Sequence, residues 1–214
     1  HDTLAYSASP VQTAFPNPWT PRPLGPAPNP EFGAFSGTAK EKQCVLLMAH
    51  AAPTMQAPDY AASIVADHII GSGGFNSLLV KEVRTRKGLA YAADSFYQAR
   101  PHWGVFGFFV ITEPSAIAKV KLALDTVLSE IRRGIPAETV AWAKQAVINS
   151  HAVQYNSPAG IIQHTMDMAF YDIPKDFDAA FLARVANLTP EEVQNAALKL
   201  ITDPWVEVIV NTGE

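Results

Sequence analysis

The chain has 214 residues, of which 48% are apolar, with a net charge of −4 and a pI near 5.9. This length and composition suit one globular domain with a substantial core. The small negative charge excludes a basic surface of the kind that binds nucleic acid or an anionic membrane. No apolar run is long enough to cross a bilayer, and the polar start is not a signal peptide. A mature exported fragment would look the same, so cytoplasm and periplasm are both open.

The first part of the chain is rich in proline. Of the 17 prolines, 8 fall at or before Pro30, among Asn, Gly and Ala residues. This composition predicts that residues 1–37 form a linker or an arm that wraps over a surface, partly in polyproline conformation. A disordered leader of an independent domain is the alternative. We expect residues 38–214 to form the globular domain.

Two buried elements are predicted next. The apolar run from Gln43 to Ala51 does not alternate with polar residues, which predicts a strand buried on both faces. Its Cys44 is interpreted as a small buried hydrophobic residue rather than a reactive thiol. A helix should open at Pro58 and end at Gly71. His68 lies on its apolar face and is interpreted as a core histidine rather than a metal ligand.

A glycine-rich turn at residues 71–74 precedes a second helix. Asn76 or Ser77 is the predicted N-cap, and Gly88 should end the helix. Leu79 and Val83 share an apolar face, which predicts a buried stripe. The charged residues should face elsewhere: they are Lys81, Glu82, Arg84 and Arg86.

A hairpin and a series of helices complete the predicted fold. The hairpin strands are 92–98 and 103–111, and the second is so apolar that we place it centrally in the sheet. Five helices should follow, starting near Pro114, Pro136, Pro158, Pro174 and the capping box at Thr189. Residues 205–210 form the last strand. This order predicts an α+β fold with helices on one face of a largely antiparallel sheet.

Signatures of several catalytic sites are missing from the sequence. The glycine turn lacks the Lys-Ser/Thr pair of a phosphate loop, and no nucleophile elbow is present. No zinc motif of the form His-x-x-Glu-His occurs, so no autonomous zinc site is expected. The histidines are His1, His50, His68, His102, His151 and His164.

Residues 71–91 resemble the second, non-catalytic half of the pitrilysin/insulinase family of zinc metallopeptidases, which includes the mitochondrial processing peptidases. The resemblance lies in the glycine-rich turn, the helix after it, the Gly-Leu-Ala-Tyr exit at 88–91, and an Arg and a Tyr seven residues apart. In this sequence these are Arg84 and Tyr91. Leu78 departs from the pattern, because the family often has Arg there. The similarity extends from about Lys40 to about Val210.

The resemblance implies that Arg84 and Tyr91 act at an active site carried by another domain or subunit. That partner would hold the zinc on an HxxEH motif, and the substrate would be a peptide enclosed between the halves. Gly73, Gly74, Phe75 and Asn76 would line the substrate chamber as a secondary role, since the glycine turn is interpreted first as a simple corner between two helices. The chain would bind no metal itself and would be inactive alone.

Plainer interpretations exist for the same residues. Arg84 could be a solvated cation at a helix end, and Tyr91 a half-buried aromatic residue of a strand. On the residues alone these ordinary roles are favoured, and the resemblance reverses that preference. The alternative function is an inert structural or peptide-binding subunit, as the core subunits of the mitochondrial respiratory complex in this superfamily have largely become.

Overall fold

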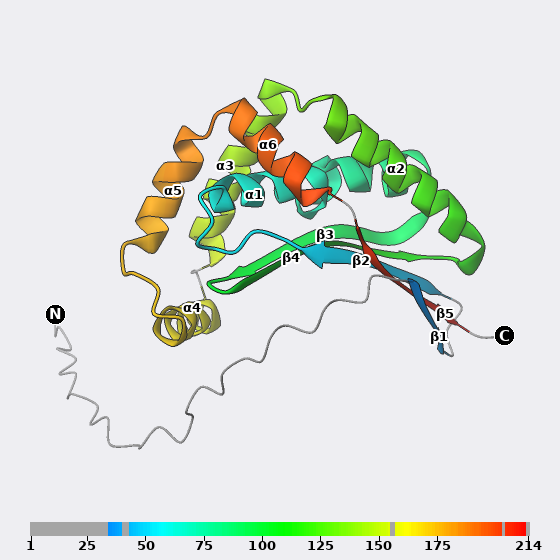
Figure 1. The fold of residues 1–214 in the computed structure, drawn as a ribbon, viewed down its shortest axis with the longest axis horizontal. Helices are drawn as coiled ribbons and strands as arrows, with labels where there is room; N and C mark the ends of the chain where they lie inside the picture. Colours follow the sequence, from blue (N-terminus) through cyan, green and yellow to red (C-terminus); the bar gives the residue numbers. More distant parts are fainter. Residues whose placement is uncertain (1–33, 40–42, 155–156, 203, 213–214) are drawn as a thin grey trace, which may run out of the picture. The chain divides into compact units, whose positions relative to one another are not determined.

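A five-stranded sheet forms one layer of the protein, and helices pack on one of its faces (Figure 1). The computed structural model describes residues 34–39, 43–154, 157–202 and 204–212. The α+β fold predicted from the sequence is confirmed. Among the described helices, none is both long and apolar enough to span a membrane.

The sheet has the strand order β1-β5-β2-β4-β3. Neighbouring strands are antiparallel, except that β1 runs parallel to β5. The strands are β1 (Ala34–Ala39), β2 (Cys44–Ala51), β3 (Ala90–Arg100), β4 (Trp103–Thr112) and β5 (Val206–Thr212). Strand β1 contains the last four residues of the range expected for the arm, and residues 1–33 of that range lie outside the described residues.

Strands β3 and β4 form the predicted hairpin, with Arg100 opposite Trp103. Strand β4 lies between β2 and β3, so its predicted central position is confirmed. The register shifts between Ala90 and Ala92, because Ala90 pairs with Thr112 while Ala92 pairs with Ile111. Tyr91 is therefore the extra residue of a β-bulge.

Strand β2 differs from its predicted burial on both faces. Cys44 and Leu46 are fully buried, but Val45 and Leu47, on the opposite face, are only half-buried. The reason is that α1, α2, α3 and α6 pack over one face of the sheet (Figure 1). The prediction of burial on both faces is therefore wrong. The second face of β2 is apolar, as the sequence indicates, but it is only half-buried.

The segment between β2 and β3 contains two stretches of π-helix. Helix α1 (Tyr60–Asp67) continues into the π-helix η1 (His68–Ser72), and a 3₁₀ turn, η2 (Gly74–Asn76), follows. The next helix consists mainly of the π-helix η3 (Val80–Arg86). Ser77 is its cap, as predicted: the Ser77 Oγ accepts a hydrogen bond from the Val80 N–H at 3.3 Å.

The sequence pattern places Glu82 on the exposed charged face of the helix, and this prediction is wrong. Glu82 is 7% exposed, and its carboxylate pairs with Lys87 at 2.8 Å and Arg86 at 3.2 Å. The prediction assumed α-helical spacing, whereas the i→i+5 bonding of η3 changes which residues share a face.

The predicted helices after β4 are all present. They are α2 (Ile117–Arg133), α3 (Ala137–Gln154), α4 (Pro158–Phe170), α5 (Phe177–Asn187) and α6 (Pro190–Leu200). The capping box at the start of α6 is confirmed, since the Thr189 hydroxyl accepts from the Glu192 N–H while the Glu192 carboxylate accepts from the Thr189 N–H. Phe106 and Phe108 of β4 are fully buried, in one core cluster with residues of α1, α2, α3, α5 and α6.

Candidate functional site

The junction between η3 and β3 carries both residues of the predicted site. The backbone turns sharply there, with Gly88 at a φ of +59°, which glycine adopts without strain. The Gly88 N–H donates to the Arg84 carbonyl at 3.0 Å, and the Leu89 N–H donates to the Val83 carbonyl at 2.9 Å. The Thr112 hydroxyl also donates to the Leu89 carbonyl. These bonds fix where the helix ends and the strand begins, between Arg84 and Tyr91.

Arg84 is exposed, and its guanidinium lies over the ring of Phe75, 5.1 Å from the ring centroid. Phe75 is itself 69% exposed, which is unusual for a large apolar side chain. A guanidinium at this distance from an aromatic ring makes a cation–π contact. The contact holds the Arg84 side chain next to the turn that carries Phe75, so the structure brings these two predicted site residues together.

Tyr91 is 55% exposed, and its hydroxyl donates a hydrogen bond to the Glu113 carboxylate at 3.0 Å. This bond, followed by the carboxylate's charge, raises the pKa of Tyr91, so the phenol keeps its proton. The bulge at this residue gives the side chain a direction that a regular strand would not. No hydrogen bond, ion pair or ring contact between described residues joins Tyr91 to Arg84.

Sequence reasoning did not identify Glu113 as a site residue. It treated this position only as the start of a helix. The register of the hairpin could have identified Glu113. Arg100 is opposite Trp103, so counting outward along both strands brings residue 91 close to residues 112 and 113.

The four residues predicted to bind substrate have different surroundings. Gly74 is exposed at a φ of +63°, and Phe75 and Asn76 are exposed beside it. Gly73 is half-buried. It packs so closely that an added Cβ would meet the His68 carbonyl and the ring of Trp142. Three of the four therefore present surface to solvent, and Gly73 packs inward.

A buried carboxyl group lies beneath the glycine turn, and sequence reasoning missed it. Asp67 is 7% exposed, and its Oδ1 accepts a hydrogen bond of 2.5 Å from the Ser95 hydroxyl. Burial raises the pKa of Asp67 to about 6, although hydrogen bonds from Ser95 and Ser72 oppose the rise. The available signal was an acidic residue among the apolar residues of α1, next to His68.

The neighbouring His68, predicted to be a core histidine, is only half-buried and packs at the edge of the core. Its ring centroid is 5.2 Å from that of Trp142, and burial lowers the pKa of the imidazole. Cys44 is also buried, as predicted, and burial raises the pKa of its thiol. Over the described ranges, no group of three or more His, Cys, Asp or Glu side chains is placed to hold a metal ion. The described residues therefore offer no set of side-chain donors that fits a zinc ion.

Several solved structures share this fold. A peptidase M16 inactive domain from Pseudomonas fluorescens is 26% identical with a TM-score of 0.74, and the match covers 86% of this chain and 44% of that one. A protease from Helicobacter pylori is 16% identical with a TM-score of 0.71, covering 85% of this chain and 45% of that one. The chain thus spans less than half the length of either. No curated protein matches the sequence at a significant level.

A shorter structure is matched over nearly its whole length. The inactive peptidase domain of a proposed zinc protease from Bordetella parapertussis is 17% identical with a TM-score of 0.69, and the match covers 83% of this chain and 97% of that one. The family model described as the peptidase M16 inactive domain matches residues 4–147, more than half of the chain. The chain therefore belongs to the peptidase M16 inactive-domain family.

Proposed function

We propose that this chain is the non-catalytic half of a zinc metalloendopeptidase, and that it supplies Arg84 and Tyr91 to peptide-bond hydrolysis at a zinc site in another domain or subunit. The observation that carries the proposal is that both side chains are exposed at one helix-to-strand junction of a peptidase M16 inactive domain. A site completed by a second domain requires this outward placement.

The two side chains suit the chemistry of peptide hydrolysis. Negative charge develops on the carbonyl oxygen of the scissile bond, and positioned donors that meet this charge lower the barrier. Tyr91 keeps its proton, and in this proposal its single O–H turns from the Glu113 carboxylate to the peptide carbonyl oxygen when substrate binds, while the Arg84 guanidinium has several N–H donors. Glu113 acts as a positioning residue, because its bond to the Tyr91 hydroxyl fixes the phenol before substrate arrives.

The open face of the sheet supports a role in enclosing substrate. Val45 and Leu47 of β2 and Phe109 of β4 are half-buried there, on the face opposite the helices. An apolar face left partly uncovered is typical of a binding surface. Separately from this face, Gly74, Phe75 and Asn76 would form an exposed substrate-binding turn beside Arg84.

The partner is a half-domain that carries HxxEH and zinc. Two observations support this partner. The chain spans less than half the length of two matched structures, and the described residues contain no group of side chains placed to hold a metal ion. The partner half would bring the zinc and the water-activating glutamate, and this chain would hold the peptide carbonyl.

The test is reconstitution with an HxxEH-bearing half-domain and measurement of kcat/KM on a peptide. The chain alone should not hydrolyse the peptide. In the complex, Tyr91→Phe and Arg84→Ala should each lower kcat/KM by about 100-fold, as expected when one transition-state donor is lost. Because both side chains are exposed, the melting temperature should not change.

The control is Arg132→Ala, which removes an exposed arginine from α2 and should leave turnover unchanged. If Tyr91→Phe and Arg84→Ala turn over as fast as the unaltered complex, the proposed roles are wrong. The chain would then be an inert structural or peptide-binding subunit.

A further inference from the structure

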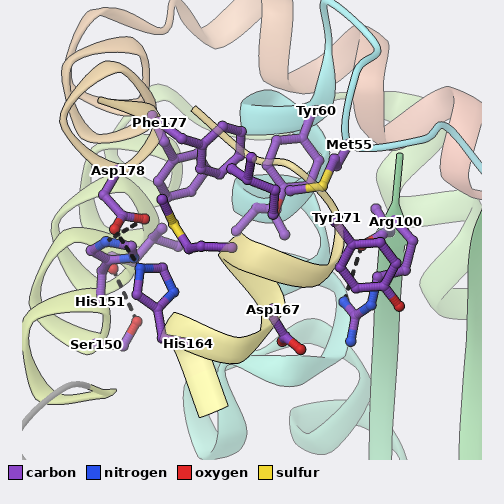
Figure 2. A pocket seen from close by; sticks show the side chains of 16 residues that line it. Met55, Tyr60, Arg100, Ser150, His151, His164, Asp167, Tyr171, Phe177 and Asp178 are labelled. Atoms are coloured by element: carbon purple, nitrogen blue, oxygen red, sulfur yellow. Dashed lines mark hydrogen bonds and ion pairs between the residues drawn. The ribbon is translucent and has the colours of Figure 1, made fainter. Parts of the chain in front are cut away.

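A cavity of about 220 Å³ lies at the other end of β3 from Tyr91. Arg100, which lines the cavity, is nine positions after Tyr91 in β3, so the two places are about 30 Å apart along the strand. The walls come from α1, β3, α3, α4 and α5, and Figure 2 shows side chains from these elements converging on the space. Nothing in the proposed peptidase mechanism uses this cavity.

Arg100 forms one side of the cavity. Its guanidinium lies 5.6 Å from the ring centroid of Tyr171 and 6.0 Å from that of Trp103. The hydrogen bond it makes among the described residues goes to the Ala99 carbonyl at 3.1 Å, and no described carboxylate pairs with it. A guanidinium that lies against aromatic rings, with most of its donors unmatched among the described residues, is prepared to bind a carboxylate in a bidentate manner.

The opposite side of the cavity is acidic. Asp178 of α5 pairs with His164 of α4 at 2.8 Å and with His151 of α3 at 3.6 Å. Figure 2 shows this cluster across the cavity from Arg100 and Tyr171. The carboxylate of Asp178 is therefore held in place by two helices besides its own, and it can accept a hydrogen bond from a ligand N–H.

Aromatic side chains line the space between these two charges. The rings of Phe177 and Phe181 are stacked 6.4 Å apart, and Tyr60 lies 6.2 Å and 5.7 Å from them. Burial raises the pKa of Tyr60; the charge of Arg100 lowers it and that of Asp178 raises it. Tyr60 thus lies within electrostatic reach of both charged ends, and its ring provides an apolar surface between them.

We propose that this cavity binds an α-amino acid or the free C-terminal residue of a peptide. The carboxylate would pair with Arg100, the apolar side chain would pack on Tyr60 and Phe177, and the N–H group would face Asp178. A volume of about 220 Å³ equals that of about seven water molecules, which is enough for one residue. This inference does not rest on the proposed peptidase function, because the binding needs no second domain.

The test is calorimetric titration of the whole chain with N-acetyl-phenylalanine and with its C-terminal amide. The free acid should bind about tenfold more tightly than the amide, because the amide cannot form the charged pair with Arg100. Phenylalanine is the third ligand: tighter binding than N-acetyl-phenylalanine identifies a free amino acid, and weaker binding identifies a peptide C-terminus. Equal affinity for acid and amide, or binding of none of the three, would overturn the inference.

Two variants locate the bound carboxylate. Arg100→Gln should weaken binding of the acid about tenfold and leave binding of the amide unchanged. Arg133→Gln, at an exposed position of α2, should bind both as the unaltered chain does. Unchanged binding of the acid by Arg100→Gln contradicts the proposal. Arg100→Gln also removes the contacts of Arg100 with Trp103 and Tyr171, which could disturb folding. The comparison of acid with amide is made on the unaltered chain, so it tests the proposal even in that case.

Discussion

At the scale of single residues, Arg84 and Tyr91 are each oriented by one neighbour that the chain itself provides. Phe75 lies under the Arg84 guanidinium, and Glu113 accepts from the Tyr91 hydroxyl. Exposed side chains of this length otherwise occupy many rotamers, and fixing them after substrate binds costs conformational entropy. The two contacts reduce that cost before a substrate is present, which favours the donor roles proposed for Arg84 and Tyr91.

Asp67 gives a prediction about pH at the same scale. Its pKa in the folded protein is about 6, against an ordinary value of 3.8. Between these values the folded chain binds more protons than the unfolded chain, so this group's contribution to stability falls as pH rises. Asp67→Asn removes the titration, so the unaltered protein should lose roughly 2 kcal/mol of stability relative to the variant between about pH 4 and pH 7.

The measurement is urea unfolding of both proteins across this pH range. Asp125→Asn, an exposed carboxylate on α2, serves as the control and should parallel the unaltered protein at every pH. If the curves for Asp67→Asn and the unaltered protein also stay parallel, Asp67 does not titrate with a raised pKa.

At the scale of secondary-structure elements, two π-helical segments lie on either side of the glycine turn. Such segments are rare, and they concentrate at functional sites because they place side chains where an α-helix would not. Segment η1 sets Gly71 against β3, and η3 ends at the junction that carries Arg84. The turn is therefore held at both ends by unusual helix geometry, in contrast to a simple corner between helices.

The two ends of this turn should tolerate substitution differently. A Cβ at Gly71 would lie 2.4 Å from the Ser95 backbone nitrogen, so Gly71→Ala must push η1 away from β3. We expect a loss of about 3 kcal/mol, at the upper end for overpacking. At Gly74 a Cβ meets nothing within 4 Å, and Gly74→Ala should cost about 1 kcal/mol from its positive φ alone. Urea unfolding of the two variants measures the difference, and equal losses would contradict the tight contact.

At the scale of the whole molecule, the helices and one face of the sheet share a single core. Phe106 and Phe108 of β4 are fully buried, and Trp205 packs against both rings. The other face keeps half-buried apolar residues. This asymmetry distinguishes the two faces: one packs against the helices and stabilises the fold, and the other is only partly covered by the described residues.

The same substitution on two phenylalanines tests this division. Phe108→Ala should lower the free energy of unfolding by about 3–5 kcal/mol, a large part of the stability of a domain of this size. Phe75→Ala removes a side chain that is 69% exposed, so it should cost less than about 1 kcal/mol. In the reconstituted complex Phe75→Ala should nevertheless reduce kcat/KM, since it removes the ring that holds Arg84. A large loss of stability in Phe75→Ala would place that ring in the core instead.

Local signals in the sequence predict the order of the elements from β2 to β5, the antiparallel hairpin, the cap at Thr189, a cap at Asn76 or Ser77, and the resemblance of residues 71–91. Those features depend on local signals: proline and glycine positions, capping residues and apolar periodicity act within a few residues of one another. Four features emerge only once the chain is folded: the half-buried second face of β2 among the described residues, the burial of Glu82, the bulge that sets Tyr91 beside Glu113, and the burial of Asp67. Each of these depends on which distant segment packs against the residue, and spacing along the chain does not carry that information.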